Sequence, residues 1–219
     1  MVAESLLELF DEQMRPHGVV SEGRGWTMVF RAPDDGDVER LVAELRTHEG
    51  YREWKYYEHD GPELRERLVA AGLEPDDEET VVVAEAASIP PPPAGVELRE
   101  DVDAFMDLVH EVFGNKGHGF PENAVPVVAF VDGQPVSCGR VDLYPGIDFA
   151  GLFGGVTLPE FRGRGLYRAT VARRAELARE AGYRWLYVDA LPTSRPILER
   201  VGFERLTSTT PFVIPREAR

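Results

Sequence analysis

The chain of 219 residues contains a single cysteine, Cys138, so it cannot form an internal disulfide. Cys138 stands in an alternating stretch, where a small buried apolar side chain is the expected role. No neighbouring His or helix start would lower the pKa of its thiol, which argues against a nucleophile. One unpaired cysteine suits a reducing compartment, and we expect a cytoplasmic location.

Long hydrophobic segments are also missing. No uninterrupted apolar run approaches the ~20 residues that a membrane-spanning helix needs. Residues 1–6 have neither a basic start nor an apolar core, so no signal peptide is expected. The sequence therefore predicts a soluble protein with no membrane partner, in which 43% hydrophobic residues suffice for one or two cores.

Basic residues are scarce, with 24 against 39 acidic residues and a net charge of −15. Such a surface repels a polyanion, so nucleic acid is not an expected partner. The acidity is concentrated in residues 1–87, which carry 9 basic and 22 acidic groups. Five arginines nevertheless lie close together in the second half, where a negatively charged ligand could bind: Arg162, Arg164, Arg168, Arg173 and Arg174.

A proline-rich segment at residues 88–95 divides the two halves, because it can continue neither a helix nor a central strand. We therefore predict an accessory acidic α/β domain at 1–87, a linker at 88–95 and a second domain at 96–219. Asp132-Gly133, between two strand-like runs, indicates a hairpin. The second half is expected to read strand 96–98, helix 102–113, strands 125–131, 136–143 and 149–158, helix 166–181 closed by Gly182, strand 185–191, helix 195–201 capped by Ser194, and strand 211–214.

The first half is predicted to be simpler: an amphipathic helix through Leu6, Leu7, Phe10 and Met14, then strand 26–30, helix 38–46, strand 53–57, helix 64–71 and strand 80–84. Its end resembles the end of the chain. Trp54 precedes Gly72-Leu73 and an apolar strand, much as Trp185 precedes Gly202-Phe203 and an apolar strand. One hypothesis is a degenerate half-repeat, and the alternative is a chance likeness of short β-α-β units.

The segment from Gly154 to Arg168 carries the chemistry. A strand runs through a glycine loop directly into a helix, whose first turn offers free N–H groups and a positive dipole end to an anion. Gly163 and Gly165 let the backbone approach phosphate oxygens, and Arg162 adds charge-assisted hydrogen bonds. This pattern predicts a pyrophosphate site.

The same segment resembles motif A of the GNAT (Gcn5-related N-acetyltransferase) superfamily, Arg/Gln-x-x-Gly-x-Gly/Ala. Arg162 and Gly165 match it, whereas Tyr167 replaces the final Gly or Ala. Residues 194–203 resemble motif B and end in its usual Gly-Phe. The resemblance covers residues 96–214 and implies a mixed α/β fold with a central mixed sheet flanked by helices.

This resemblance implies acetyl-CoA as co-substrate, no metal, and transfer of the acetyl group to an amine, most simply of a small molecule. Pantetheine would lie between strands 154–158 and 185–191, and the thioester carbonyl would face the backbone N–H of Gly155. The glycine pair Gly154-Gly155 predicts a bulge in its strand. The implied coenzyme-binding residues are Val156, Thr157, Leu158, Arg162, Gly163, Arg164, Gly165, Leu166, Tyr167 and Ser194.

Three other interpretations of the segment are weaker. A Rossmann dinucleotide site would need a third glycine where Arg168 stands, and the ~30 residues after Asp189 are too few for the other half of a doubly wound sheet. Arg-Gly-Arg-Gly also occurs in nucleic-acid-binding segments, which the acidic charge disfavours. A glycine turn with solvated arginines leaves the motif B match unexplained.

The general acid and base are not evident from the sequence. Leu198 stands where many GNAT members carry a tyrosine acid, and Gly151 where some carry a glutamate base. Tyr167 is a substitute acid or a packing residue. The candidate bases, chosen by position alone and otherwise solvated or capping groups, are His118, which lies in a loop that often shapes the acceptor pocket, with Asp148, Glu111 and His110. The contrasting function is a non-catalytic acyl-CoA-binding or regulatory module.

In the acidic first half, the loop at 31–37 would correspond to the phosphate-binding loop if the halves are repeats. Its three aspartates would repel pyrophosphate, so this half should not bind coenzyme A. Three roles fit it: covering the acceptor cleft, mediating a homodimer, or presenting an acidic wall to a cationic amine. The plain alternative is a solvated acidic surface.

Overall fold

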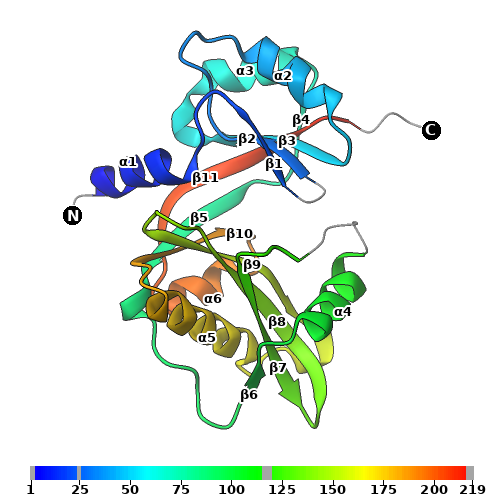
Figure 1. Cartoon of the computed structure of the whole chain (residues 1–219), viewed down its shortest axis with the longest axis vertical. Coiled ribbons are helices and arrows are strands. Elements are labelled where there is room, and N and C mark those ends of the chain that lie inside the picture. The colour runs from blue at the N-terminus through cyan, green and yellow to red at the C-terminus, as the bar shows by residue number, and fades with distance from the viewer. Residues whose placement is uncertain (1–2, 24–25, 115–119, 216–219) are drawn as a thin grey trace. The chain divides into compact units, whose positions relative to one another are not determined.

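The computed structural model describes residues 3–23, 26–114 and 120–215, and it has a mixed α/β architecture (Figure 1). The chain forms two compact units, each described by itself. Unit 1 comprises Met1–Val81, Asp189–Pro192 and Leu206–Arg219, and unit 2 comprises Val82–Val188 and Thr193–Arg205. No helix of the described residues is long and apolar enough to cross a membrane.

Unit 1 is built around a β-α-β element. Strand β2 pairs antiparallel with β1 and parallel with β3, and helix α2 connects β2 to β3. The C-terminal strand β11 pairs antiparallel with both β3 and β4. The elements are α1 (Ala3–Met14), β1 (Val20–Gly23), β2 (Trp26–Val29), α2 (Val38–Thr47), β3 (Tyr51–Tyr57), the 3-10 turn η1 (Glu58–Asp60), α3 (Pro62–Ala70), β4 (Glu74–Pro75), the first residues of β5 (Glu79–Glu85) and most of β11 (Glu204–Val213).

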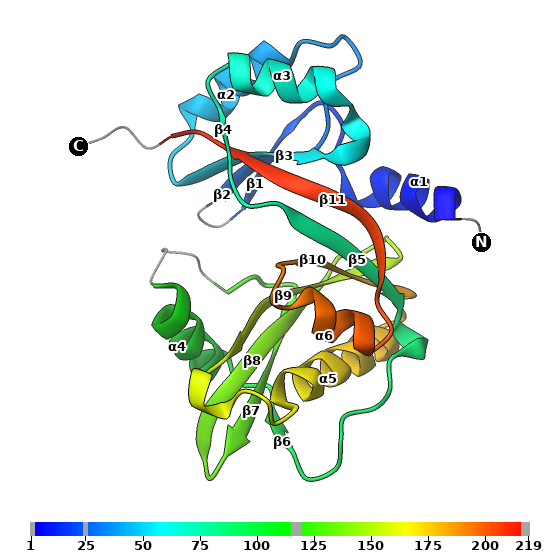
Figure 2. The same ribbon diagram turned by 180° about the vertical axis from the view of Figure 1, so that it is seen from behind.

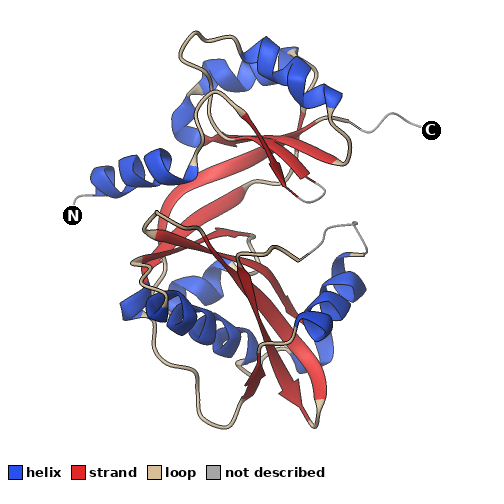
Figure 3. Cartoon of the chain, viewed as in Figure 1, coloured by secondary structure: helices blue, strands red, loops and turns tan. Residues whose placement is uncertain are grey.

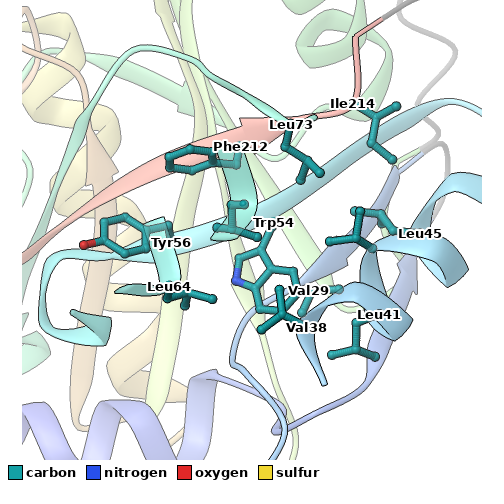
Figure 4. Close-up of a cluster of buried hydrophobic side chains, with 12 residues drawn as sticks. Val29, Val38, Leu41, Leu45, Trp54, Tyr56, Leu64, Leu73, Phe212 and Ile214 are labelled. Atoms are coloured by element: carbon teal, nitrogen blue, oxygen red, sulfur yellow. The ribbon is translucent and has the colours of Figure 1, made fainter. Parts of the chain in front are cut away.

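Helices α2 and α3 cover one face of these strands and enclose the core of unit 1 (Figure 4). Trp54 of β3 is fully buried at its centre, between Leu41 of α2 and Phe212 of β11. The apolar residues of α2 recur at helical spacing, so burying them fixes which face of the helix meets the sheet. Alternate residues of β3 supply this core, while its other residues point to the opposite face.

Unit 2 contains an antiparallel meander of β6, β7, β8 and β9, followed by β10, which pairs parallel with β9. Helix α5 makes the crossover between these two parallel strands. The elements are the 3-10 turn η2 (Ala86–Ser88), β6 (Glu97–Arg99), α4 (Val102–Phe113), β7 (Ala124–Val131), β8 (Gln134–Leu143), β9 (Phe149–Thr157), the 3-10 turn η3 (Pro159–Phe161), α5 (Leu166–Glu180), β10 (Trp185–Ala190) and α6 (Arg195–Arg200).

Helices α4 and α5 lie on opposite faces of the meander (Figure 3). Phe105 of α4 packs with Val128 and Val156, whereas Leu166 of α5 packs with Ala129. Because successive strand residues point to opposite faces, Val128 and Ala129 serve two different cores. Strand β7, whose sequence is apolar throughout, is therefore covered on both sides.

Most elements predicted from the sequence are present. Helix α4 has the predicted bounds, and the hairpin turns at Asp132-Gly133, where both residues have positive φ (51° and 79°). The short strands β1 and β4 were not predicted, because neither has enough alternating apolar residues to give a signal. Ser194 is the N-cap of α6 but does not cap it through its side chain.

The units differ from the predicted domains. The proline-rich segment at 88–95 lies inside unit 2, and residues 206–219 group with unit 1 instead of with residues 96–205. The physical reason is that β11 pairs with β3 over five positions, from Thr209 opposite Tyr57 to Val213 opposite Glu53 (Figure 2). Residues 82–85 of β5 belong in turn to unit 2. Each half of the sequence thus gives part of its last strand to the other half's unit.

Candidate functional site

Strand β9 contains a β-bulge at Gly154 and Gly155. The register with β8 shifts here, so that the two glycines together face the single residue Gly139. Gly154 has a φ of +62°, a conformation that residues with a Cβ rarely adopt. A Cβ on Gly154 would lie 2.8 Å from the ring of Phe105. The bulge predicted from the glycine pair is confirmed.

The parallel pairing of β9 and β10 is short. It joins Phe149–Gly151 to Trp185–Tyr187 and ends there, although β9 continues to Thr157. A Cβ on Gly151 would lie 2.4 Å from the ring of Phe153 and 3.0 Å from that of Tyr187. These two rings pack edge to face, with centroids 5.6 Å apart, at the point where pairing ends. Beyond Gly151, β9 is therefore paired with β8 only.

The loop after β9 leads directly into helix α5. Gly163 and Gly165 have φ values of +75° and +76°, and a Cβ at either position would meet no atom within 4 Å. Gly165 is the N-cap of the helix and has no side chain that could accept a hydrogen bond from its first turn. The first-turn N–H groups therefore remain available to an anion, next to the positive end of the helix dipole.

Two exposed arginines flank this loop. The Nε of Arg162 donates to the carbonyl oxygen of Thr157 at 3.2 Å, which ties the loop to the end of β9. The guanidinium of Arg164 lies 5.4 Å from the ring centroid of Phe161. These contacts hold both side chains beside the N-terminus of α5, and their remaining N–H groups can donate to an anionic ligand.

The five clustered arginines of the sequence do not form one site. Arg173 pairs with Glu100 at 3.0 Å and Glu176 at 3.2 Å. Arg174 points from α5 into the protein, where its side chain is 1% exposed. These two side chains therefore lie away from the loop, because the helical period turns them to other faces of α5.

Tyr167, in the first turn of α5, lies against the bulge. Its ring lies 2.8 Å from the position that a Cβ on Gly155 would occupy, and its hydroxyl oxygen lies 3.4 Å from that position. On the same face of the sheet, a Cβ on Gly139 would lie 2.5 Å from the guanidinium of Arg174. Gly155 of the bulge and Gly139 opposite it thus make room for two side chains of α5.

The family comparison matches residues 83–203, more than half of the chain, to the Acetyltransferase (GNAT) family. The chain belongs to the GNAT acetyltransferase family. It is an acyltransferase by family, and its mixed sheet flanked by helices is the GNAT fold expected from motifs A and B.

Solved structures share this fold at low sequence identity. A GCN5-related N-acetyltransferase from Kribbella flavida has a TM-score of 0.68 and 16% identity, over 98% of this chain and 95% of that one. One from Sphaerobacter thermophilus has a TM-score of 0.61 and 17% identity, over 91% and 76%. A tandem GNAT protein of the clavulanic acid biosynthesis pathway has 0.57 and 15%, over 90% and 78%. None of the curated proteins matches the chain significantly.

Several GNAT-implied coenzyme residues have buried side chains. Val156 and Leu158 pack in the core beneath α4, and Leu166 of α5 packs against Ala129 and Val136. The hydroxyl of Thr157 lies 2.7 Å from that of Ser137. Such side chains hold β9 and α5 in place, so a coenzyme could use only the backbone groups of these residues.

Packing accounts for Leu198 and Gly151, which stand where other GNAT members carry the acid and the base. Leu198 is fully buried in α6, where a tyrosine hydroxyl would need a hydrogen-bond partner. Gly151 leaves room for the Phe153 and Tyr187 rings, so a glutamate there would collide with them. Ser194 lies at the start of α6, where its carbonyl oxygen accepts from the N–H of Ile197 at 3.0 Å.

The weaker candidates lie on segments other than the bulge. Asp148 precedes β9, seven residues and roughly 20 Å of strand from Gly155. His110 and Glu111 lie in the last turn of α4. His118 lies outside the described residues. Among the residues that the structure does describe, no group of three or more His, Cys, Asp or Glu side chains could hold a metal ion.

Tyr167 is thus the candidate catalytic side chain nearest to Gly155 among those described. Burial raises the pKa of its phenol, and the positive charge of the Arg174 guanidinium offsets part of this rise. Burial also raises the pKa of the Cys138 thiol to about 12, which leaves it un-ionised at neutral pH.

Arg174 was counted from the sequence among five clustered arginines near which an anionic ligand could bind, and its place beside Tyr167 was not predicted. The signal that could have found it is its spacing. Arg174 follows Tyr167 by seven residues and Thr170 by four, which puts all three on one face of α5. Val171, Ala175 and Ala178 make that face apolar, so an arginine on it is a buried charge.

Proposed function

We propose that this protein transfers the acetyl group of acetyl-CoA to an amine, as a cytoplasmic enzyme. The observation that supports this most directly is the arrangement of the bulge in β9, the early end of its pairing with β10, and the uncapped start of α5. A nucleotide pyrophosphate fits an uncapped helix start flanked by two arginines, and an extended chain fits the unpaired edge of a strand.

Each part of the coenzyme would have its own partners. The first-turn N–H groups of Leu166 and Tyr167, with Arg162 and Arg164, would hold the pyrophosphate. Backbone groups of β9 near Val156 would hold the pantetheine amide groups. Acetyl-CoA would supply an acetyl group activated as a thioester, which an amine can attack without an acyl-enzyme.

The protein's contribution at the reacting carbon would come from the bulge. The N–H of Gly155 would donate to the carbonyl oxygen as negative charge develops on it, an effect of about 3 kcal/mol for a well-placed donor. The amine must reach the carbon in its neutral form, and its base is not assigned. A small-molecule amine is our proposed acceptor, and a protein amino group is the alternative.

We also propose that unit 1 is a degenerate GNAT half that does not bind coenzyme. In both units a hairpin precedes two parallel strands joined by a helix. Helix α3 and helix α6 also end alike, because Leu73 N–H donates to Leu68 and Phe203 N–H donates to Leu198, at 3.1 Å each. The structurally similar protein of the clavulanic acid pathway is described as a tandem GNAT protein. Acceptor binding and homodimerisation are the roles proposed for this half.

The second candidate is a non-catalytic acyl-CoA-binding module, which the buried Leu198 and the crowded Gly151 favour. The two functions differ in turnover. We expect release of coenzyme A on at least one amine from a panel of primary amines, whereas the module would bind acetyl-CoA and turn over none.

The coenzyme site is tested by thermal unfolding with acetyl-CoA. At 100 times its Kd the ligand should add about 2.7 kcal/mol of stability, which corresponds to a Tm rise of about 5–10 °C. Arg162→Ala combined with Arg164→Ala should abolish most of this rise. Arg179→Ala, at the exposed far end of the same helix, is the matched control and should keep it. An unchanged Tm in the parent protein would refute the proposal.

A further inference from the structure

Arg140 of β8 lies beside the bulge, and one nitrogen of its guanidinium has no partner among the described residues. Its Nε donates to Asp142 at 2.7 Å, and its Nη2 donates to the same carboxylate at 3.3 Å. The remaining nitrogen, Nη1, lies 3.6 Å from the position that a Cβ on Gly154 would occupy. A guanidinium has five N–H donors, so both N–H groups of Nη1 remain available next to the bulge.

The guanidinium of Arg140 is held in one orientation. Arg140 and Asp142 are two residues apart in β8, so their side chains leave the same face of the strand and form a bidentate contact. The Cζ atom of Arg140 also lies 5.3 Å from the ring centroid of Phe153. From α5, the Nη1 of Arg174 donates to the carbonyl oxygen of Arg140 at 3.3 Å. A donor fixed in this way loses little conformational entropy when it binds a ligand.

Of the two ion-pair partners, the guanidinium is the one that a ligand can reach. The side chain of Asp142 is 8% exposed and both of its oxygens accept from Arg140, whereas the side chain of Arg140 is 25% exposed. A molecule at this surface therefore meets positively charged donors, which bind an anion best. Because the charge of Asp142 offsets part of this positive charge, a singly charged carboxylate suits the site better than a doubly charged phosphate.

This guanidinium lies on the α4 side of the sheet, near the point where the acetyl group would react. A Cβ on Gly154 would lie 2.8 Å from Phe105 of α4 as well as 3.6 Å from Arg140, so both side chains approach the bulge from one side. Tyr167 of α5 fills the space beside Gly155 on the other side. Gly155 itself is exposed, and the pairing of β9 with β10 ends before the bulge. A ligand bound to Arg140 would therefore lie next to the exposed bulge.

We propose that Arg140 binds a carboxylate of the acceptor, so that the acceptor is an amine that also carries a carboxylate, as an amino acid does. This rests on the proposed acetyl transfer. The Nη1 of Arg140 donates to the acceptor's carboxylate, while Asp142 holds the guanidinium in place. A short carbon chain then directs the acceptor's amine toward the thioester carbon beside Gly155. Arg140 thus selects the substrate by its charge and contributes to its orientation.

Paired acceptors test the carboxylate without any mutation. α-, β- and γ-amino acids are compared with their carboxamides, which have nearly the same size and lack the negative charge. We expect kcat/KM of the best amino acid to exceed that of its carboxamide by about 10–100-fold, the range for a hydrogen bond between charged groups. A carboxamide also lowers the pKa of a neighbouring amine, so more of that amine is neutral, which works against the expected preference. Equal values would overturn the inference, and so would faster acetylation of aminoalkyl phosphates than of amino acids.

Arg140→Gln removes the positive charge and should remove the preference with it. We expect KM for the amino acid to rise about 10–100-fold, while KM for its carboxamide and for acetyl-CoA each change less than about threefold. Arg99→Gln is the matched control and should keep the preference. Arg99 also pairs with a carboxylate two residues away, that of Glu97, and lies 4.2 Å from the ring centroid of Phe130, but it does so on β6. An equal loss for the amino acid and its carboxamide in Arg140→Gln would mean that the ion pair serves only the fold.

Two further variants cover the case in which Arg140→Gln does not fold, since it leaves the carboxylate of Asp142 buried without a cation. Arg140→Gln combined with Asp142→Asn removes both charges and should show the same loss of preference. Arg140→Lys keeps the charge but cannot form the bidentate contact, so it should keep only part of the preference. A folded double variant that still prefers the amino acid to its carboxamide would contradict the role of Arg140.

Failure of this inference and failure of acetyl transfer give different results. If the parent enzyme acetylates amines but does not favour those with a carboxylate, the inference fails and acetyl transfer stands. If acetyl-CoA produces no Tm rise and no amine is acetylated, acetyl transfer fails, and the role of Arg140 in acceptor binding fails with it.

Discussion

Helices α2 and α5 occupy equivalent places in the two units, each between two parallel strands, yet their N-termini are built oppositely. At α2 the side chain of Asp37 accepts from the N–H of Arg40 at 3.0 Å, and Asp35 accepts from the N–H of Asp37 at 3.0 Å. At α5 the N-cap is Gly165, which has no side chain to offer. One helix start is filled by carboxylates of its own chain, and the other is left for an external anion.

The buried charges of the two units differ in how they are paired. Unit 1 buries Arg15 against Asp11 and Asp60, and Lys55 against Asp189, with Glu53 buried as well. Unit 2 buries Asp142, which pairs with Arg140, and Arg174, which donates hydrogen bonds to neutral oxygens of Thr170 and Arg140. Burial raises the pKa of Glu53, against the opposing effect of Lys55.

The largest effect should come from placing an aspartate at the N-cap of α5, as α2 has at Asp37, and the quantity affected is the affinity for acetyl-CoA. Gly165→Asp should weaken acetyl-CoA binding by about 100-fold, or about 2.7 kcal/mol, because the carboxylate would bind the first-turn N–H groups and repel pyrophosphate. Calorimetric titration measures this. Gly165→Ala, which has the same backbone strain at φ +76° but no charge, should bind clearly better. Equal affinities would mean that the helix start is not the anion site.

A smaller effect is expected for the carboxylates of unit 1. Burial raises the pKa of Glu79 from 4.5 to about 7, with Lys55 opposing and Asp189, Glu53 and Asp76 adding to the rise. A raised folded-state pKa gives stability that is complete below pH ~4.5 and is lost as pH rises through ~7. From this group we expect a loss of about 1–3 kcal/mol between these limits.

Glu79→Gln should flatten this part of the stability profile, as measured by urea unfolding at several pH values. Glu78→Gln, an exposed neighbour, is the matched control and should leave the profile unchanged. A Glu79→Gln profile parallel to that of the parent between pH 4.5 and 7 would contradict the assigned titration.

The smallest effect concerns the cap of α2. Asp37→Ala should cost about 1 kcal/mol of stability, because the N–H of Arg40 loses its acceptor. It should not create a second coenzyme site, since Asp34 and Asp35 still oppose an anion there. Denaturant unfolding and acetyl-CoA stoichiometry measure the two expectations. Asp107→Ala, on the exposed face of α4, is the control for loss of a negative charge. A second equivalent of coenzyme bound by Asp37→Ala would contradict the difference between the helix starts of α2 and α5.

The sequence could predict those parts of the fold that depend on residues close together in the chain. The bounds of α4 follow from apolar residues at helical spacing, and the hairpin follows from Asp132-Gly133, whose backbone needs positive φ. The partner of β11 could not be predicted. Its residues would suit either unit, and pairing with β3 depends on residues some 150 positions earlier in the chain.

The candidate site divides in the same way. The bulge and the glycine loop were predictable, because a glycine pair inside a strand is typical of a bulge and closely spaced glycines before a helix are typical of an anion-binding loop. The proximity of Tyr167 to Gly155 was not predictable, since it requires α5 to fold back across β8 and β9 at a particular angle. The same packing turns Arg174 from an expected surface cation into a buried one.

By itself the sequence determined the GNAT family, the bulge, the glycine loop that would bind pyrophosphate, and the aspartates at the start of α2. These are properties of short segments, governed by glycine conformation, helix ends and charge. Only the tertiary structure decided which strand β11 joins and which α5 side chains reach the bulge. Both depend on contacts between segments far apart in the chain, whose geometry is set by packing of the whole unit.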